Sequence, residues 1–219
     1  MSYSLMLENI SKTFGRRLIF KGIDFRFSEN KIYGIAGSNG SGKSTLTKII
    51  AGVLSPSKGK VVHLNESSEI IAEKLHNYLG FVSPYLVLYD EFSAVENLKY
   101  FAKIRGINYD GEKVKYLLNR FGLLKRENDL LKAYSSGMKQ RMKFIFALQH
   151  SPKLLLLDEP TSNLDDEGKE TVYDVIKEVK KDSVVIIASN EKNDLELCDE
   201  ILEIAKYKNN SNHLKKTKQ

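Results

Sequence analysis

The feature that most constrains the fold of this chain is a glycine-rich loop between an apolar segment and a helical one. Residues 31–36 read Lys-Ile-Tyr-Gly-Ile-Ala, which is typical of a buried strand, and residues 37–45 read Gly-Ser-Asn-Gly-Ser-Gly-Lys-Ser-Thr. Apolar residues then keep helical spacing up to Gly52. The sequence therefore predicts a strand, a loop and a helix in succession, which is the context that the pattern G-x-x-x-x-G-K-[ST] requires.

This loop has the chemistry of a polyphosphate site. Glycines let the backbone fold tightly, so that successive N–H groups face inward at a helix N-terminus, whose dipole also favours anions. Lys43 is expected to neutralise β- and γ-phosphate charge, and the Ser44 hydroxyl to ligate Mg²⁺. A chance match is the alternative, but the flanking strand and helix argue against it. The candidate binding residues are Gly37, Ser38, Asn39, Gly40, Ser41, Gly42, Lys43, Ser44 and Thr45.

A second chemical feature is an apolar run that ends in two acids. Four leucines at 154–157 precede Asp158 and Glu159. A strand that ends at Asp158 places its carboxylate at the edge where open α/β sheets bind ligands, so Asp158 is a candidate ligand of Mg²⁺. Glu159 points to the other side of the chain and is a candidate general base for the water that attacks the γ-phosphate. Adjacent acids are common on surfaces, but four preceding leucines do not fit a surface.

The order of the remaining segments predicts an α/β protein with a mainly parallel sheet. Short β-like segments at 5–10 and 23–27 indicate an antiparallel edge. From 69 to about 132 the pattern is mostly helical, which predicts an α-rich insertion. Helical segments then alternate with apolar ones as far as residues 184–189, as in a parallel sheet.

Composition limits the class of protein. With 42% hydrophobic and 28% charged residues, the 219-residue chain is expected to fold as one ordinary domain, and it has no apolar run of the roughly 18–20 residues that cross a bilayer. A lone Cys198 excludes an internal disulfide, so the cytoplasm is the expected compartment. Residues 206–219 carry five of the six net positive charges. This basic tail is expected to be a flexible terminus, or to contact anionic lipid weakly, and no nucleic-acid partner is expected.

A third motif connects these features to a known family. Residues 134–138, Tyr-Ser-Ser-Gly-Met, precede a helix and the acidic strand. In this order the motifs resemble the ATP-binding cassette (ABC) family, the nucleotide-binding subunits of ABC transporters, over about residues 3–205. The resemblance implies the P-loop NTPase fold in an ATP-binding domain at 1–205, with an N-terminal antiparallel β subdomain and a helical insertion at about 84–140. It also implies that the chain binds and hydrolyses ATP.

The family's signature loop is usually Leu-Ser-Gly-Gly-Gln, of which Ser135 and Gly137 are kept here. In the family two cassettes face head to tail, so that each signature loop completes the ATP site of its partner. The resemblance thus implies a second copy of this chain, or a similar cassette, as partner. It further implies separate membrane-spanning subunits that hold the pair at the cytoplasmic face of the membrane.

Two further positions match the family. Phe14 occupies the place of the aromatic that stacks on adenine, although a core position in a strand is the alternative. Asp165 resembles the acid of the loop that crosses between the two sites. It is also placed to cap the following helix, and both roles are compatible.

Two departures bear on catalysis. Pro84 stands where the family normally has a glutamine that ligates Mg²⁺ or water, and Pro84 offers no side-chain donor or acceptor. Asn190 stands where the family normally has a histidine near the γ-phosphate, and Asn190 donates but cannot become cationic. Hydrolysis is still expected, with Asn190 as its donor. Together with residues 134–138, these departures look similar to the branch that contains the haem-exporter ATPase of cytochrome c maturation.

Two other functions stay open at this point. One is a soluble ATP-dependent switch, as in the family's translation factors or chromosome proteins, which usually carry a second cassette or a long coiled-coil insertion. The other is a regulator with little turnover, which Pro84 and Asn190 allow. The apolar cluster at 86–92 is either core of the insertion or a groove for a segment of a membrane partner.

Overall fold

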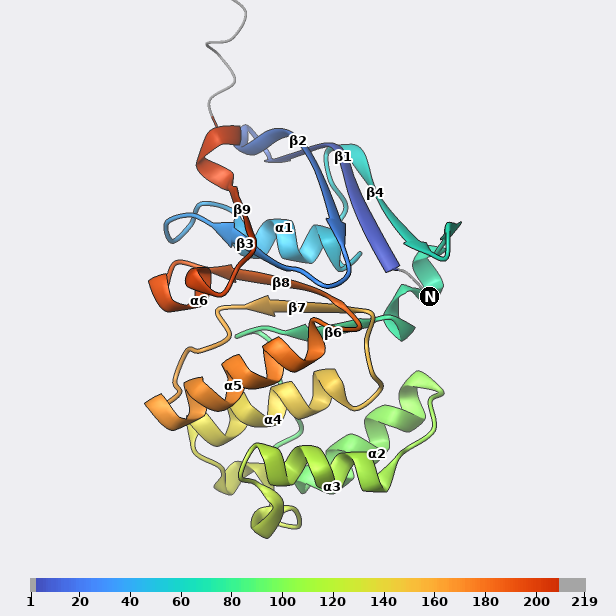
Figure 1. The fold of residues 1–219 in the computed structure, drawn as a ribbon, viewed down its shortest axis with the longest axis vertical. Coiled ribbons are helices and arrows are strands. Elements are labelled where there is room, and N and C mark those ends of the chain that lie inside the picture. Colours follow the sequence, from blue (N-terminus) through green and yellow to red (C-terminus); the bar gives the residue numbers. More distant parts are fainter. Residues whose placement is uncertain (1–2, 209–219) are drawn as a thin grey trace, which may run out of the picture.

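Two sheets of different type stack along the long axis of the molecule (Figure 1). In the computed structural model, which describes residues 3–208, a parallel sheet has the strand order β6-β7-β8-β3-β9 and an antiparallel sheet the order β2-β1-β4-β5. The parallel strands are β3 (Ile32–Ala36), β6 (Leu79–Val82), β7 (Leu154–Asp158), β8 (Val184–Ser189) and β9 (Glu200–Glu203). The antiparallel strands are β1 (Tyr3–Phe14), β2 (Arg17–Ser28), β4 (Lys58–Asn65) and β5 (Ser68–Glu69). The predicted fold class is confirmed.

Helices cover both faces of the parallel sheet. Helix α1 (Lys43–Ile50) lies between the two sheets, whereas α4 (Ser136–Leu148) and α5 (Asp166–Val179) cover the opposite face. The side chains of β7 alternate between the two cores, with Leu154 and Leu156 facing α1 and Leu155 and Leu157 facing α4 and α5. Because both faces are buried, the strand reads as a continuous apolar run.

A helical region packs against α4 at the far end of the molecule (Figure 1). It contains α2 (Ala94–Arg105) and α3 (Gly111–Arg120), which lie within the segment predicted to be mostly helical. Helix α2 begins with a capping box of Ser93 and Glu96 and ends at Gly106, whose φ of 68° is left-handed. The boundaries 84–140 for an inserted subdomain stay a prediction.

Residues 69–83, at the start of the segment predicted to be mostly helical over 69 to about 132, depart from that prediction because they include strands. The segment forms β5, a 3₁₀ turn over Ala72–Asn77 and β6, which pairs in parallel with β7 from Leu79 opposite Leu154 to Val82 opposite Leu157. Gly80 of β6 packs closely against the end of α4, because a Cβ at this position would lie 2.5 Å from the carbonyl oxygen of Ala147. The four residues of β6 are too few to show in the sequence the period of two that marks a strand.

The C-terminal part ends near the antiparallel sheet. Helix α6 (Lys192–Glu196) follows β8, and a 3₁₀ turn over Ile204–Tyr207 follows β9. Most of the predicted basic tail, residues 209–219, lies outside the described residues. Among residues 3–208, no helix has the length and apolar character needed to cross a membrane.

Candidate nucleotide-binding site

The glycine loop connects the carboxyl end of β3 to α1, as the sequence predicts. Gly40 and Gly42 have φ angles of 72° and 115°, a region that side chains with a Cβ rarely adopt. Space is also limited at both ends of the loop, since a Cβ on Gly37 would lie 2.5 Å from Ser41 Oγ and one on Gly42 would lie 2.6 Å from a methyl group of Ile19. These glycines keep the backbone turned tightly around the start of α1.

The loop forms one wall of an open cavity of about 480 Å³. Besides residues 39–45, the walls are formed by Phe14, Arg17, Ile19, Pro84, Tyr85 and Glu159. The structure thus brings residues 39–45 of the predicted loop, Phe14 and Glu159 to one place, and it adds Arg17 and Tyr85, which no sequence motif singles out. Phe14 is 48% exposed at the end of β1, so its alternative assignment to the core is wrong.

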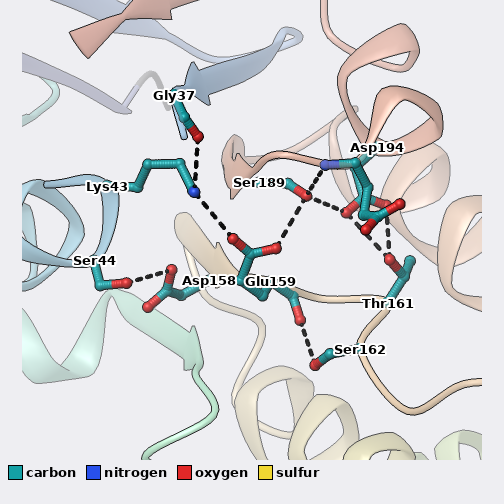
Figure 2. A network of polar contacts seen from close by, with 10 residues as sticks. Gly37, Lys43, Ser44, Asp158, Glu159, Thr161, Ser162, Ser189 and Asp194 are labelled. Atoms are coloured by element: carbon teal, nitrogen blue, oxygen red, sulfur yellow. Dashed lines mark hydrogen bonds and ion pairs between the residues drawn. The ribbon is translucent and has the colours of Figure 1, made fainter. Parts of the chain in front are cut away.

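Lys43 connects the loop to the acidic strand (Figure 2). Its Nζ donates to the carbonyl oxygen of Gly37 at 2.9 Å and lies 3.2 Å from Oε1 of Glu159. The Lys43 side chain is 5% exposed and that of Glu159 is 26% exposed. The ammonium group is therefore fixed over the loop, between the end of β3 and the end of β7.

Asp158 is a buried carboxylate with unused bonding capacity. Ser44 Oγ donates to its Oδ1 at 3.0 Å, whereas its Oδ2 has no hydrogen-bond partner among the described residues. Burial raises the pKa of Asp158 above its ordinary value, and this effect exceeds the lowering by Ser44. A cation beside Oδ2 would stabilise the ionised form, and the oxygen donors of Ser44 and Asp158 suit a hard cation.

Glu159 is held in a strained backbone conformation. Its φ of 49° is left-handed, which is uncommon for a residue other than glycine. The backbone N–H donates to Ala188 O at 2.8 Å, and the carbonyl oxygen accepts from Ser162 Oγ at 2.8 Å. Two neighbouring segments thus fix the backbone, so that the carboxylate faces Lys43 on one side and Ser189 on the other (Figure 2).

The family model described as ABC transporter matches residues 20–162 of the chain. The chain belongs to the ABC transporter family. The linearmycin resistance ATP-binding protein LnrL of Bacillus subtilis (strain 168) is 31% identical over 201 residues, which are 90% of this chain and 65% of that protein. The lantibiotic transport ATP-binding protein SrtF of Streptococcus pyogenes is 33% identical over 186 residues, which are 85% of this chain and 79% of that protein.

Solved structures of the family share the fold. An ATP-binding subunit of an ABC transporter has a TM-score of 0.80 at 23% identity, over 91% of this chain and 85% of that one. A dimeric bacterial ABC transporter cassette has a TM-score of 0.79 at 23% identity, over 91% of this chain and 94% of that one. The predicted family is confirmed, whereas the haem-exporter branch stays a prediction.

The residues of this ABC chain that match the family's signature, Ser135 and Gly137, do not line the cavity of its glycine loop. Ser135 caps α4 by accepting from the N–H of Met138 at 3.3 Å, and a Cβ on Gly137 would lie 2.9 Å from Asn163 O. The signature loop and the crossing loop together border a cavity of about 270 Å³ whose lining includes Ser136 and Asn163 but no residue of 37–45. Asp165 Oδ1 accepts from the N–H of Gly168 at 3.0 Å, which confirms its predicted role as a helix cap.

The two departures from the family pattern lie at different places. Pro84 borders the cavity, while Asn190 is exposed and directly follows the last residue of β8. Sequence reasoning missed three residues close to the end of β8, namely Thr161, Ser189 as a contact of Glu159, and Asp194. Asp194 lies on a five-residue helix, which is too short for a periodic pattern to single it out.

Proposed function

We propose that this chain is the ATP-binding and ATP-hydrolysing subunit of an ABC transporter, in which two cassettes enclose two ATP molecules head to tail. The observation that carries the proposal is the convergence of the glycine loop, Lys43 and Glu159 on one cavity. Close by lies Oδ2 of Asp158, which has no hydrogen-bond partner within residues 3–208. A phosphate-binding loop beside a candidate general base is an arrangement for hydrolysis as well as for binding.

Each site residue then has a distinct role. The N–H groups of residues 39–45 and the ammonium of Lys43 bind the β- and γ-phosphates, while Phe14 stacks on the adenine. Ser44 and Asp158 hold Mg²⁺, which when bound neutralises charge on the phosphate oxygens. Glu159 accepts the proton of the attacking water, and Asn190 donates to the γ-phosphate.

The second half of each ATP site comes from a partner cassette. Ser135, Gly137 and Asp165 of one chain face the nucleotide held by the other, because within one chain the signature loop borders a different cavity from that of residues 39–45. ATP binding closes the pair and hydrolysis reopens it.

The other partner is a membrane-spanning subunit, through which the cassette attaches to the cytoplasmic face of the membrane. The segment after Pro84 is divided in two: Leu88 is buried in the core, whereas Tyr85, Val87 and Tyr89 are 69%, 85% and 63% exposed. These exposed apolar side chains, next to a cavity of about 510 Å³ that Tyr85 also lines, form the proposed contact surface. The names of the two relatives, linearmycin resistance and lantibiotic transport, favour a transported compound of the antibiotic class.

Calorimetric titration of purified protein with Mg·ATP tests the nucleotide site. Lys43→Ala should abolish binding with an unchanged circular dichroism spectrum, because the ammonium lies over the loop rather than in the hydrophobic core. Lys177→Ala on α5, an exposed lysine, is the matched control and should bind ATP like the wild type. Equal affinity of Lys43→Ala and wild type would show that the loop is not the phosphate site.

A further inference from the structure

A buried carboxylate that belongs to none of the assigned roles lies behind Glu159. The side chain of Asp194, on α6, is fully buried and is surrounded by hydroxyl groups. Its Oδ1 accepts from Tyr173 at 2.9 Å and from Thr161 at 3.0 Å, and its Oδ2 accepts from Ser189 at 2.7 Å. Tyr173 belongs to α5, Thr161 to the loop that follows Glu159, and Ser189 to the end of β8, so Asp194 connects three elements around the site. Figure 2 shows the contacts of Asp194 with Thr161 and Ser189.

Ser189 has one hydroxyl proton and two carboxylate acceptors. Its Oγ lies 2.7 Å from Asp194 Oδ2 and 3.3 Å from Glu159 Oε2, and it also accepts the N–H of Glu191 at 3.0 Å. A single proton makes one good hydrogen bond, and the shorter contact to a buried carboxylate is the stronger one. The geometry therefore places the proton on the Asp194 side of Ser189.

We propose that Asp194 is a positioning residue for ATP hydrolysis: by holding the proton of Ser189, it keeps Oε2 of Glu159 free to accept a proton from water. The inference rests on the proposed function, in which Glu159 is the general base. If Ser189 donated to Glu159 instead, that hydrogen bond would occupy Oε2, the oxygen that the reaction needs.

Asp194→Asn isolates this effect, because an amide fits the site without losing a hydrogen bond. The amide oxygen in the place of Oδ1 accepts from Thr161 and Tyr173 as before, while the NH₂ group in the place of Oδ2 donates to Ser189 Oγ. Ser189 must then turn its own proton toward Glu159. We expect kcat to fall about tenfold or more, which corresponds to the free energy of one hydrogen bond to a charged group. KM for ATP and the calorimetric ATP affinity should stay at the wild-type values.

Two further variants separate positioning from stability. Tyr173→Phe removes another donor to the same carboxylate without touching Ser189, so it should lower the denaturation midpoint but leave kcat within about twofold of wild type. In a Ser189→Ala background no hydroxyl is left to turn, so Asp194→Asn should change kcat less than about twofold.

The experiment is steady-state ATP hydrolysis by these variants, with wild type and Lys43→Ala measured alongside. A tenfold loss of kcat in Asp194→Asn that disappears in the Ser189→Ala background supports the proposal. Wild-type turnover in Asp194→Asn, or an equal loss with and without Ser189, overturns the role of Asp194 while the proposed function stands. Hydrolysis that is equal in wild type and Lys43→Ala overturns both.

Discussion

Glu159→Gln should raise the affinity of the cassette for Mg·ATP while removing most of its turnover. Oε1 of Glu159 lies 3.2 Å from Nζ of Lys43, which we propose binds the γ-phosphate. The carboxylate therefore competes with the phosphate for the same ammonium group. At this distance two unit charges interact by about 1 kcal/mol in bulk water and about 5 kcal/mol at an effective dielectric constant of 20.

The exposure of Glu159 decides between these limits. Its side chain is 26% exposed, so solvent screens the pair and the lower part of the range applies. We expect a gain of about 1–2 kcal/mol, which is about five- to thirty-fold in affinity. Turnover should fall by about 10²–10⁴, because the amide cannot accept the proton of the attacking water.

Calorimetric titration with Mg·ATP measures the affinity, and phosphate release measures the turnover. ATP-driven pairing also tightens apparent binding, so the titration is done at two protein concentrations, with light scattering to report the monomer. Glu159→Asp is the matched control, since it keeps the charge but moves it away from Lys43, and it should lose turnover while gaining less affinity than Glu159→Gln. Equal affinity of wild type and Glu159→Gln in the monomer would refute competition for Lys43.

Three other changes test separate parts of the molecule. Gly137→Asp should prevent the ATP-dependent dimer in light scattering, and Gly137→Ala, which makes the same 2.9 Å Cβ contact with Asn163 O without the charge, shows how much of the loss is steric. Asn190→Ala should lower kcat about 5- to 150-fold by removing a donor near the γ-phosphate. Asn190→His should add a pH dependence of kcat between roughly 5.5 and 7.5. If Asn190→Ala turned over ATP as fast as wild type, Asn190 would have no part in the mechanism. Burial lowers the pKa of His63 to about 4, so its contribution to stability is complete above about pH 6.5 and is lost as the pH falls toward 4. Urea unfolding should show about 2 kcal/mol less stability at pH 5.0 than at 7.5 from this residue, and a smaller difference in His63→Gln.

The sequence predicted the parts of the site that lie in consecutive residues. The loop from Gly37 to Thr45 and the pair Asp158–Glu159 are local patterns, and both stand at strand ends where the pattern places them. Their meeting follows from topology, because β3 and β7 both pair with β8 in parallel and their carboxyl ends share one edge of the sheet. The local motifs and the geometry of parallel sheets together were sufficient to predict that the glycine loop and the acidic pair lie at one edge of the sheet.

Strand β6 and the surroundings of Asp194 could not be predicted from local sequence patterns. Strand β6 lies inside the segment predicted to be mostly helical, and its four residues Leu79–Val82 are too few to show the period of a strand. Asp194 looks like an ordinary acid of a short polar helix, yet it is fully buried. Its hydroxyl donors Thr161, Tyr173 and Ser189 are 33, 21 and 5 residues away in sequence. Only the packing of α5, α6 and β8 brings them together.

Pro84 replaces the family's glutamine, but the segment around it still contacts α4 through backbone hydrogen bonds. The proline removes a side-chain donor and acceptor from the segment between the nucleotide cavity and the exposed residues after it. The backbone of this segment nevertheless binds α4, because Nζ of Lys143 on α4 donates to the carbonyl oxygens of Ser83 and Pro84 at 3.1 and 3.3 Å. A carbonyl is present whatever the side chain, so a motif comparison at position 84 misses this contact. Helix α4 begins at the signature loop, so these hydrogen bonds connect the signature loop, through α4, to the segment that contains Tyr85 and Val87.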